Sequence, residues 1–186
     1  PEESVTAFTF ATRGDAGVDP GTVHYDWKEF GMDAWQSPVR PNLRTSLITD
    51  PADGRIPALT PEAQRRAAAR PAPSFDSPLA DSWEDRSLSE RCITFGSPRL
   101  GAGYNSYYQI QQTREYVAIT METIHDVRIV PLDSRPHVGS NIRQWLGDSR
   151  GHWEGDTLVI DTKNYSPKSR LMGSTENLHV TERLTR

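Results

Sequence analysis

Residues 145–162 constrain the fold most, because a two-residue turn signal lies there between two runs of strand-forming residues. The turn is Gly155-Asp156, since glycine accepts the positive φ that the first central position of such a hairpin loop needs. The sequence therefore predicts an antiparallel hairpin with strands over 151–154 and 157–162.

With that turn, side chains alternate between the two faces of the hairpin. Trp153, Leu158 and Ile160 are predicted to be buried on one face. The opposite face carries His152, Glu154, Thr157, Val159 and Asp161. On this second face His152 is expected within diagonal reach of Asp161, so reactive side chains gather there.

The second half of the chain has β character. Six segments have strand composition with some alternation of apolar and polar residues: 107–112, 115–121, 126–130, 151–154, 157–162 and 178–185. About six strands in roughly 90 residues are typical of an antiparallel meander. We predict a mainly β fold, with an antiparallel sheet that forms a sandwich or a partly open barrel.

Residues 1–92 are predicted to form an extended, proline-rich arm, because short apolar pieces there show no sustained period. One short helix is expected near 61–70. Thr60 caps it, Pro61 is its first residue, the helix dipole favours Glu62, and Pro71 ends it. The predicted organisation is thus an irregular arm over 1–92 and an antiparallel β domain over 93–186.

Composition excludes several classes of protein. The net charge of -4 is spread along the chain, unlike the basic face of a nucleic-acid binder. No apolar run reaches the ~18 to 20 residues of a membrane span. The single cysteine, Cys92, excludes an intramolecular disulfide, and we expect it to be a small buried residue. The chain begins at Pro1 without an initiator methionine, which is typical of a processed chain.

Several long motifs carry a family resemblance. They are RTSLI from Arg44 with DPADGRIP from Asp50, LSERC from Leu88, HDVRIVPLD from His125 with RPH from Arg135, and GDSRGHWEGDTLVIDT from Gly147. Together they resemble a group of secreted bacterial proteins with no assigned function, over residues 44–186. A short member with an added N-terminal arm is similar in kind to an extrinsic subunit of a bacterial photosynthetic reaction-centre and antenna complex. The resemblance implies a periplasmic or extracellular location, peripheral to a membrane.

Two catalytic interpretations of the hairpin region are weak. GDSRG at 147–151 matches the G-x-S-x-G nucleophile elbow, but that elbow needs a strand before it and a helix after it, whereas a hairpin follows here. We interpret GDSRG as a turn. The carboxylates of Asp148, Glu154, Asp156 and Asp161 offer the acid and base of a glycosidase or lyase, but acids beside hairpin turns are ordinary.

The main catalytic alternative is a metal-dependent hydrolase or lyase. Nitrogen and oxygen donors that suit Zn²⁺, Mn²⁺ or Fe²⁺ come from His125, His137, His152, Glu154 and Asp161, with His179, Asp126 and Glu176 as further donors. No helical H-x-x-x-H or C-x-x-C spacing fixes their geometry.

The favoured hypothesis is a non-catalytic, extracytoplasmic accessory subunit that needs no cofactor. Its arm would tether or stabilise a larger, membrane-bound assembly, with a photosynthetic complex as the named example. The expected partner contacts are Trp27 and Trp35 in the arm and Arg65, Arg66 and Arg70 on the helix. The expected partners are other protein subunits; nucleic acid and a transmembrane segment of its own are not expected.

Overall fold

The computed structural model describes residues 46–69, 81–98, 107–169, 171 and 173–185. The chain divides into two compact units, Pro1–Ile56 and Pro57–Arg186. The expected boundary at 92/93 between the arm and the β domain stays a prediction. In the described part of the first unit, the Ser46 hydroxyl donates to the Gly54 carbonyl at 2.7 Å.

The expected helix is present as α2 (Pro61–Ala69). Its start follows the predicted chemistry, because the N–H of Ala63 donates to Thr60 Oγ1 at 3.2 Å. Ala63 is the only buried residue of the helix. The guanidinium of Arg66 bonds Glu62 at 2.8 Å and donates to the Gly173 carbonyl at 3.2 Å. The contact with Gly173 ties α2 to the loop that precedes the last strand.

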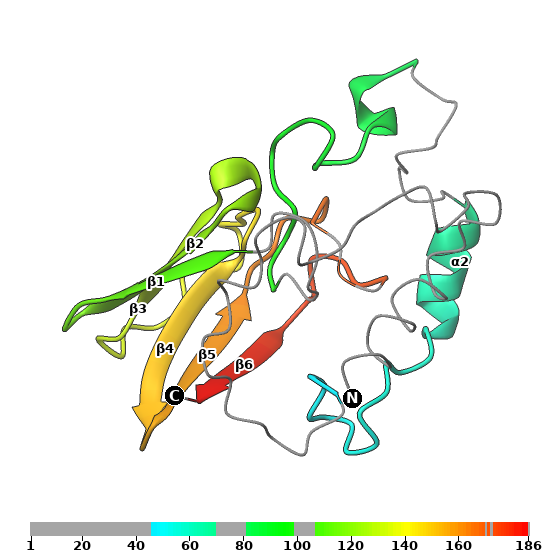
Figure 1. Cartoon of the computed structure of the whole chain (residues 1–186). Helices are drawn as coiled ribbons and strands as arrows, with labels where there is room; N and C mark the ends of the chain where they lie inside the picture. Colours follow the sequence, from blue (N-terminus) through cyan, green and yellow to red (C-terminus); the bar gives the residue numbers. More distant parts are fainter. Residues whose placement is uncertain (1–45, 70–80, 99–106, 170, 172, 186) are drawn as a thin grey trace, which may run out of the picture. The chain divides into compact units, whose positions relative to one another are not determined.

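Six strands form two antiparallel three-stranded sheets (Figure 1). The first sheet contains β1 (Tyr108–Gln112), β2 (Tyr116–Met121) and β3 (Val127–Pro131), in that order. The second contains β4 (Asp148–Glu154), β5 (Thr157–Lys163) and β6 (Val180–Thr185). Two single 3₁₀ turns, η2 (Trp83–Asp85) and η3 (Thr123–His125), complete the described elements. The predicted mainly β, antiparallel fold is confirmed, and within the described residues the sheets do not close into a barrel.

The apolar core lies between the two sheets. Its buried members are Val117, Ile119, Val130, Leu158 and Ile160, with Leu132 packed against them. Gly151 of β4 brings the layers close together, because a Cβ on this residue would meet Val130 Cγ1 at 2.7 Å and Leu132 Cδ2 at 2.9 Å. Alternating apolar residues on β2, β3 and β5 therefore bury one face of each sheet against the other.

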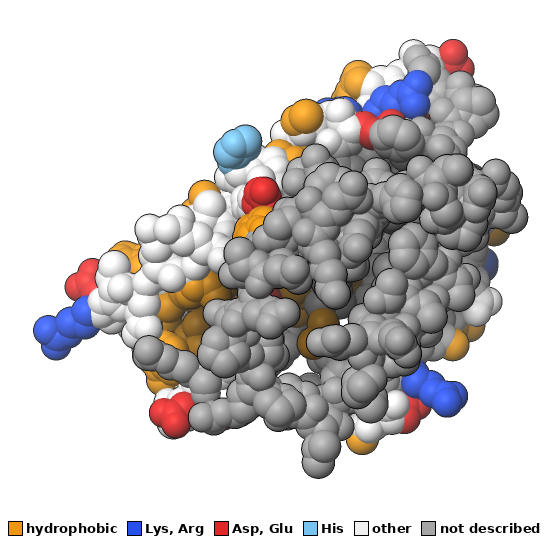
Figure 2. Space-filling view, viewed as in Figure 1, with side chains coloured by type: hydrophobic (Ala, Val, Ile, Leu, Met, Phe, Trp, Pro, Cys, Tyr) orange, Lys and Arg blue, Asp and Glu red, His pale blue; other side chains and the backbone are white. Residues whose placement is uncertain are grey.

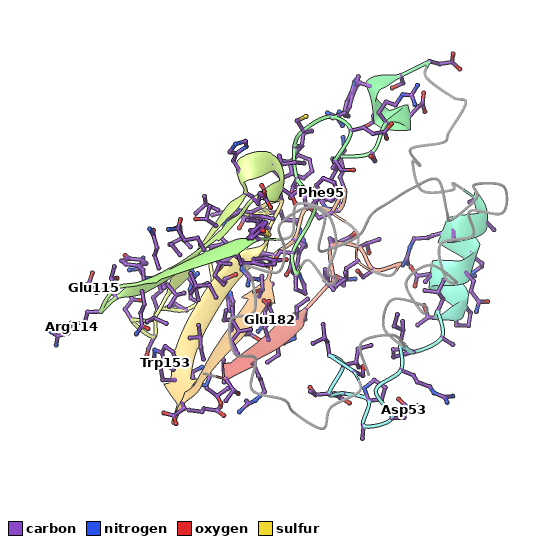
Figure 3. All side chains as sticks on the ribbon, in the orientation of Figure 1. Asp53, Phe95, Arg114, Glu115, Trp153 and Glu182 are labelled. Atoms are coloured by element: carbon purple, nitrogen blue, oxygen red, sulfur yellow. The ribbon has the colours of Figure 1, made fainter. Side chains whose placement is uncertain are left out.

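One end of the interlayer space is polar. Arg128 of β3 and Glu182 of β6 form a two-bond pair across the sheets, with nitrogen–oxygen distances of 2.5 and 3.1 Å. Arg128 also donates to Ser97 Oγ at 2.6 Å. Figure 3 labels Glu182 on β6. This pair joins the two sheets by charge as well as by packing.

Tyr165 is buried beside this pair, and its hydroxyl makes no hydrogen bond within the described residues. Ser97 and Thr162 are its neighbours, and their hydroxyls also bond Arg128 and Ser149 respectively. Burial raises the pKa of Tyr165 to about 12. The interior therefore holds this phenol in its neutral form.

The predicted hairpin has the predicted register, with His152 opposite Val159 and Gly151 opposite Ile160. Two details were wrong. GDSRG is not a turn, because β4 already begins at Asp148. Trp153 lies near the hairpin tip and is 42% exposed, whereas Val159 on the outer face is buried at 4% exposed. Trp153 is among the labelled residues of Figure 3.

The expectation for Cys92 was also wrong, because its side chain is exposed. Cys92 follows a turn in which its N–H donates to the Ser89 carbonyl at 3.0 Å, and its φ is 52°. The sequence gives no apolar period around this residue that would have indicated which way it points.

Candidate functional site

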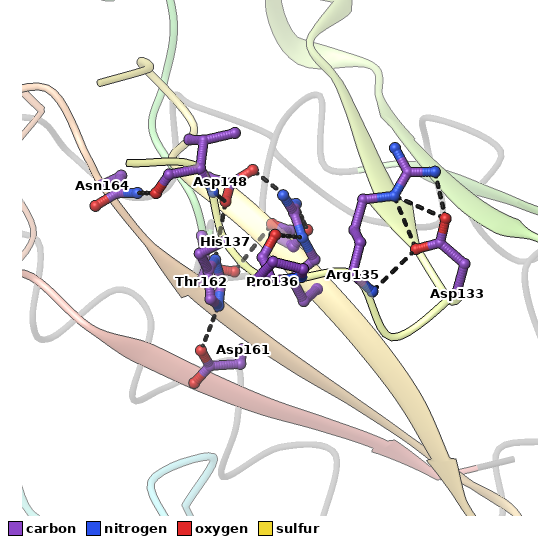
Figure 4. A network of polar contacts seen from close by, with 11 residues as sticks. Asp133, Arg135, Pro136, His137, Asp148, Asp161, Thr162 and Asn164 are labelled. Carbon is purple, nitrogen blue, oxygen red and sulfur yellow. Dashed lines mark hydrogen bonds and ion pairs between the residues drawn. The ribbon is translucent and has the colours of Figure 1, made fainter. Parts of the chain in front are cut away.

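The outer face of the second sheet carries a network of charged side chains (Figure 4). Alternate residues of β4 and β5 point away from the core, which places Asp148, Arg150, Asp161 and Lys163 on this face. The β3–β4 connection supplies His137, and the residue before β6 supplies His179. The network therefore joins residues that lie more than forty positions apart in the sequence.

Asp148 holds His137 from one side. Its Oδ2 lies 2.9 Å from His137 Nδ1 and accepts the N–H of Val138 at 3.0 Å. Its Oδ1 accepts from Arg150 at 2.6 Å. Arg150 also donates to the Pro136 carbonyl at 3.1 Å, so both the carboxylate and the backbone beside His137 are fixed. A buried carboxylate with three donors is fully satisfied.

Asp161 lies on the other side of the same imidazole. Its Oδ1 is 2.8 Å from His137 Nε2, and its Oδ2 contacts His179 Nε2. Lys163 Nζ lies 3.5 Å from Oδ1. His137 therefore has a carboxylate oxygen within hydrogen-bond distance of each of its ring nitrogens.

The pKa of Asp161 follows from these neighbours. Partial burial raises the pKa, but hydrogen bonds from His179 and His137, together with the charges of His179 and Lys163, lower it below its ordinary value. The ionised form of Asp161 therefore stabilises the folded state.

This shift predicts a pH dependence of stability. A folded pKa below the unfolded value of about 3.9 stabilises the fold above that value, and the stabilisation is lost as the pH falls through the folded pKa. We expect Asp161→Asn to flatten the acid limb of the melting temperature against pH, measured by thermal unfolding from neutral pH downward. Asp156→Asn in the exposed hairpin turn is the control. Identical acid limbs for wild type and Asp161→Asn would contradict this assignment.

The five residues of the alternative metal site do not form one cluster. His137 and Asp161 are in contact. His152 lies beside Glu154 at 3.1 Å, on the exposed end of β4, and does not reach Asp161 as its hydrogen-bond partner. His125 is exposed in η3. Among the described residues, no group of three or more His, Cys, Asp or Glu side chains is arranged to hold a metal ion.

Glu154 has a second partner, since it accepts from Arg183 of β6 at 2.5 Å. The hydrogen bonds from Arg183 and His152 lower the pKa of Glu154. Glu154, His152 and Arg183 therefore form a surface ion cluster near the hairpin tip, separate from the network around His137.

A different feature of the fold is the first strand of the first sheet. Every residue of β1 is exposed, and among the described residues only β2 pairs with it. The N–H of Glu122 donates to the Tyr107 carbonyl, and the N–H of Thr113 donates to the Tyr116 carbonyl. Since alternate residues of an antiparallel strand bond to opposite sides, Ile110 and Gln112 direct their backbone groups away from β2.

Ile110 extends the core-facing side of the first sheet beyond the area that the second sheet covers. Ile110 is paired with the buried Ile119, so both side chains point to the same side, yet Ile110 is 57% exposed. Figure 2 shows hydrophobic surface in the area where β1 and β4 lie in Figure 1. Within the described residues, the interlayer space is therefore open beside β1.

Charge distinguishes β1 from the other outer strands. Its sequence, YQIQQ, contains no charged residue. By contrast, β3 carries Arg128, β4 carries Asp148 and Arg150, and β6 carries Glu182 and Arg183. Charged residues on outer strands normally prevent the addition of a further strand. The uncharged run of β1 is visible in the sequence, but its position at the edge of the sheet is not.

The expected partner-binding residues are only partly described. Trp27, Trp35 and Arg70 lie outside the described residues. Arg65 and Arg66 are both exposed on α2. Arg66 is engaged by Glu62 and Gly173, whereas in the described part of the chain Arg65 makes no side-chain hydrogen bond or ion pair.

A scan against protein-family models found no match, and neither the curated proteins nor the solved structures gave a significant match. The family resemblance of the motifs therefore stays a prediction. In the part of the chain that the structure describes, no helix combines the length and apolar character that crossing a membrane needs.

Proposed function

We propose that this chain is a non-catalytic, extracytoplasmic accessory subunit that binds other protein subunits of a larger assembly. The observation that carries the proposal is β1, an exposed and uncharged outer strand beside an open part of the core. An extended segment of a partner bonds to the backbone of Ile110 and Gln112, and its apolar side chains cover Ile110.

The hydrogen bonds that the reactive side chains already make also favour a binding function over catalysis. Asp148, His137 and Asp161 are already bonded to one another and to fixed cations. Two cavities lined by described residues have other walls: one lies around 83–96 and 167–169, and the other is lined by residues 95–98, 165, 169, 171 and 178. A substrate at the His137 network would have to displace these contacts at a cost in free energy.

The finer parts of the proposal have separate support. Arg65 on α2 is an exposed guanidinium suited to a carboxylate on a partner. The role of the arm through Trp27 and Trp35, the periplasmic or extracellular location, and a photosynthetic, membrane-bound assembly come from the sequence and its resemblance, and they stay predictions.

Ile110→Pro tests the proposal. Proline removes the N–H that points away from β2, and outer strands tolerate proline at such positions, so the fold is kept while an added strand loses a hydrogen bond. The ring also excludes close pairing at that position. We expect the recovery of the variant with the native assembly to fall about tenfold or more in a competition with wild type.

Ile110→Thr is the matched control, because it shortens the same side chain but keeps the N–H and the β-branched shape. Recovery of this variant should lie between those of wild type and Ile110→Pro. The melting temperature of each isolated variant shows whether the fold is intact. Equal recovery of wild type and a folded Ile110→Pro would refute binding through this strand.

A further inference from the structure

A cavity of about 300 Å³ lies between residues 83–96 and the loop 167–169. This volume is at the lower end of the range of small-molecule sites. The part of the wall that the argument uses consists of Trp83, Glu84, Arg86, Arg91, Phe95 and Lys168. Figure 3 labels Phe95 on this segment. The cavity is separate from both β1 and the His137 network.

Hydrogen bonds build both walls into the fold. Ser82 caps η2 by accepting the N–H of Glu84 at 3.1 Å, and its own N–H donates to Asp85 at 2.7 Å. On the opposite wall, Ser169 donates to the Trp145 carbonyl at 2.7 Å. Lys168 Nζ and Glu84 Oε1 connect the two walls at 2.7 Å. Hydrogen bonds therefore fix residues of both cavity walls and connect the two walls to each other.

The wall is positively charged in a chain whose net charge is -4. Three cations, Arg86, Arg91 and Lys168, face a single lining carboxylate, Glu84. Glu84 bonds Lys168, and Arg86 lies 3.6 Å from Glu90 just outside the cavity. Hydrogen bonds from the Ser87 backbone and hydroxyl, together with the charge of Arg86, lower the pKa of Glu90. Lys168 and Arg86 thus each have an acidic partner.

Lys168 Nζ also lies 4.5 Å from the centroid of the Trp83 ring. Arg91 shares this contact with Trp83 but differs from the other two cations in its polar partners. Its guanidinium carbon lies 4.3 Å from the centroid of the Trp83 ring, and in the described part of the chain the side chain makes no hydrogen bond or ion pair. Its N–H donors are held by stacking on one face and have no acceptor there. Trp83 and Phe95 are both exposed and add apolar surface around this cation.

We propose that this cavity binds a small organic oxyanion, a carboxylate or phosphate joined to an apolar body. The Arg91 guanidinium donates to the oxyanion, for which its fork geometry is suited, and Lys168 adds charge. Trp83 and Phe95 contact the apolar body. This site is independent of the proposed subunit function.

Titration of the full chain with phenyl phosphate and phenylacetate, followed by calorimetry and by the Trp83 indole N–H signal, tests the proposal. Saturable binding of at least one probe is expected, and the tighter probe identifies the oxyanion. Inorganic phosphate and acetate, which lack the apolar body, should bind more weakly. No saturable binding of either aromatic probe would overturn the proposal.

Arg91→Gln should weaken binding about tenfold or more, because a hydrogen bond between charged groups is lost. Arg114→Gln at the exposed β1–β2 turn, labelled in Figure 3, has the same charge change and should bind as wild type does. Arg91→Lys keeps the charge without the fork and should bind with intermediate affinity. Equal affinities of folded Arg91→Gln and wild type would overturn the assignment of Arg91.

Discussion

Replacing Glu182 with alanine is expected to lower the free energy of unfolding by about 3–5 kcal/mol, the largest effect of a single charged residue in this fold. The Arg128 side chain is only 6% exposed and that of Glu182 16% exposed. Removal of the carboxylate leaves a buried guanidinium whose remaining side-chain partner is Ser97. Urea unfolding of the variant and wild type measures the difference.

Two further variants distinguish this cause from a general weakness of β6. Thr181→Ala, at an exposed neighbouring position, should change stability by less than about 0.5 kcal/mol. The double variant Arg128→Met/Glu182→Leu removes both charges together, and it should be much more stable than Glu182→Ala. If the single and double variants were equally destabilised, the unpaired charge would not be the cause.

Ile160→Ala is expected to cost about 2–5 kcal/mol, towards the upper part of that range. Ile160 is 0% exposed in the core between the sheets. Its cross-strand neighbours are Gly151, which has no side chain to move into the space, and Glu182, whose carboxylate is bonded to Arg128. The cavity therefore persists, and its volume adds to the loss of buried apolar surface. Chemical denaturation measures the change.

Ile129→Ala is the matched control for this prediction. It removes the same atoms from β3, but Ile129 lies on the outer face and is 50% exposed. Its cost in free energy of unfolding should be below about 1 kcal/mol, because this side chain is already half exposed to water and its loss removes little buried apolar surface. Equal costs for the two variants would contradict the placement of the core between the sheets.

The strands could be predicted from the sequence because their signals are local. The Gly155-Asp156 turn fixes the β4–β5 register, and Thr60 with Pro61 fixes the start of α2. GDSRG was misread because its glycine and polar residues are typical of turns. In the fold, Ser149 instead bonds Thr162 in the interior at 2.9 Å, a contact that depends on the neighbouring strand.

The sites were less predictable because they depend on contacts between distant segments. His152 and Asp161 were expected to meet because they are close in the hairpin. Asp161 instead binds His137 from the β3–β4 connection and His179 from the approach to β6. Likewise, the ion pair of Arg128 and Glu182 joins residues 54 positions apart. No period or short motif in the sequence indicates such pairs.

Size-exclusion chromatography with light scattering on material from the natural source tests the central claim most directly. The accessory-subunit account predicts that the natural chain elutes in a complex much larger than its own monomer, together with other protein subunits. It also predicts that Ile110 and Gln112 amide protons exchange more slowly in that complex than in the isolated chain. A natural chain that elutes as a monomer would contradict the account.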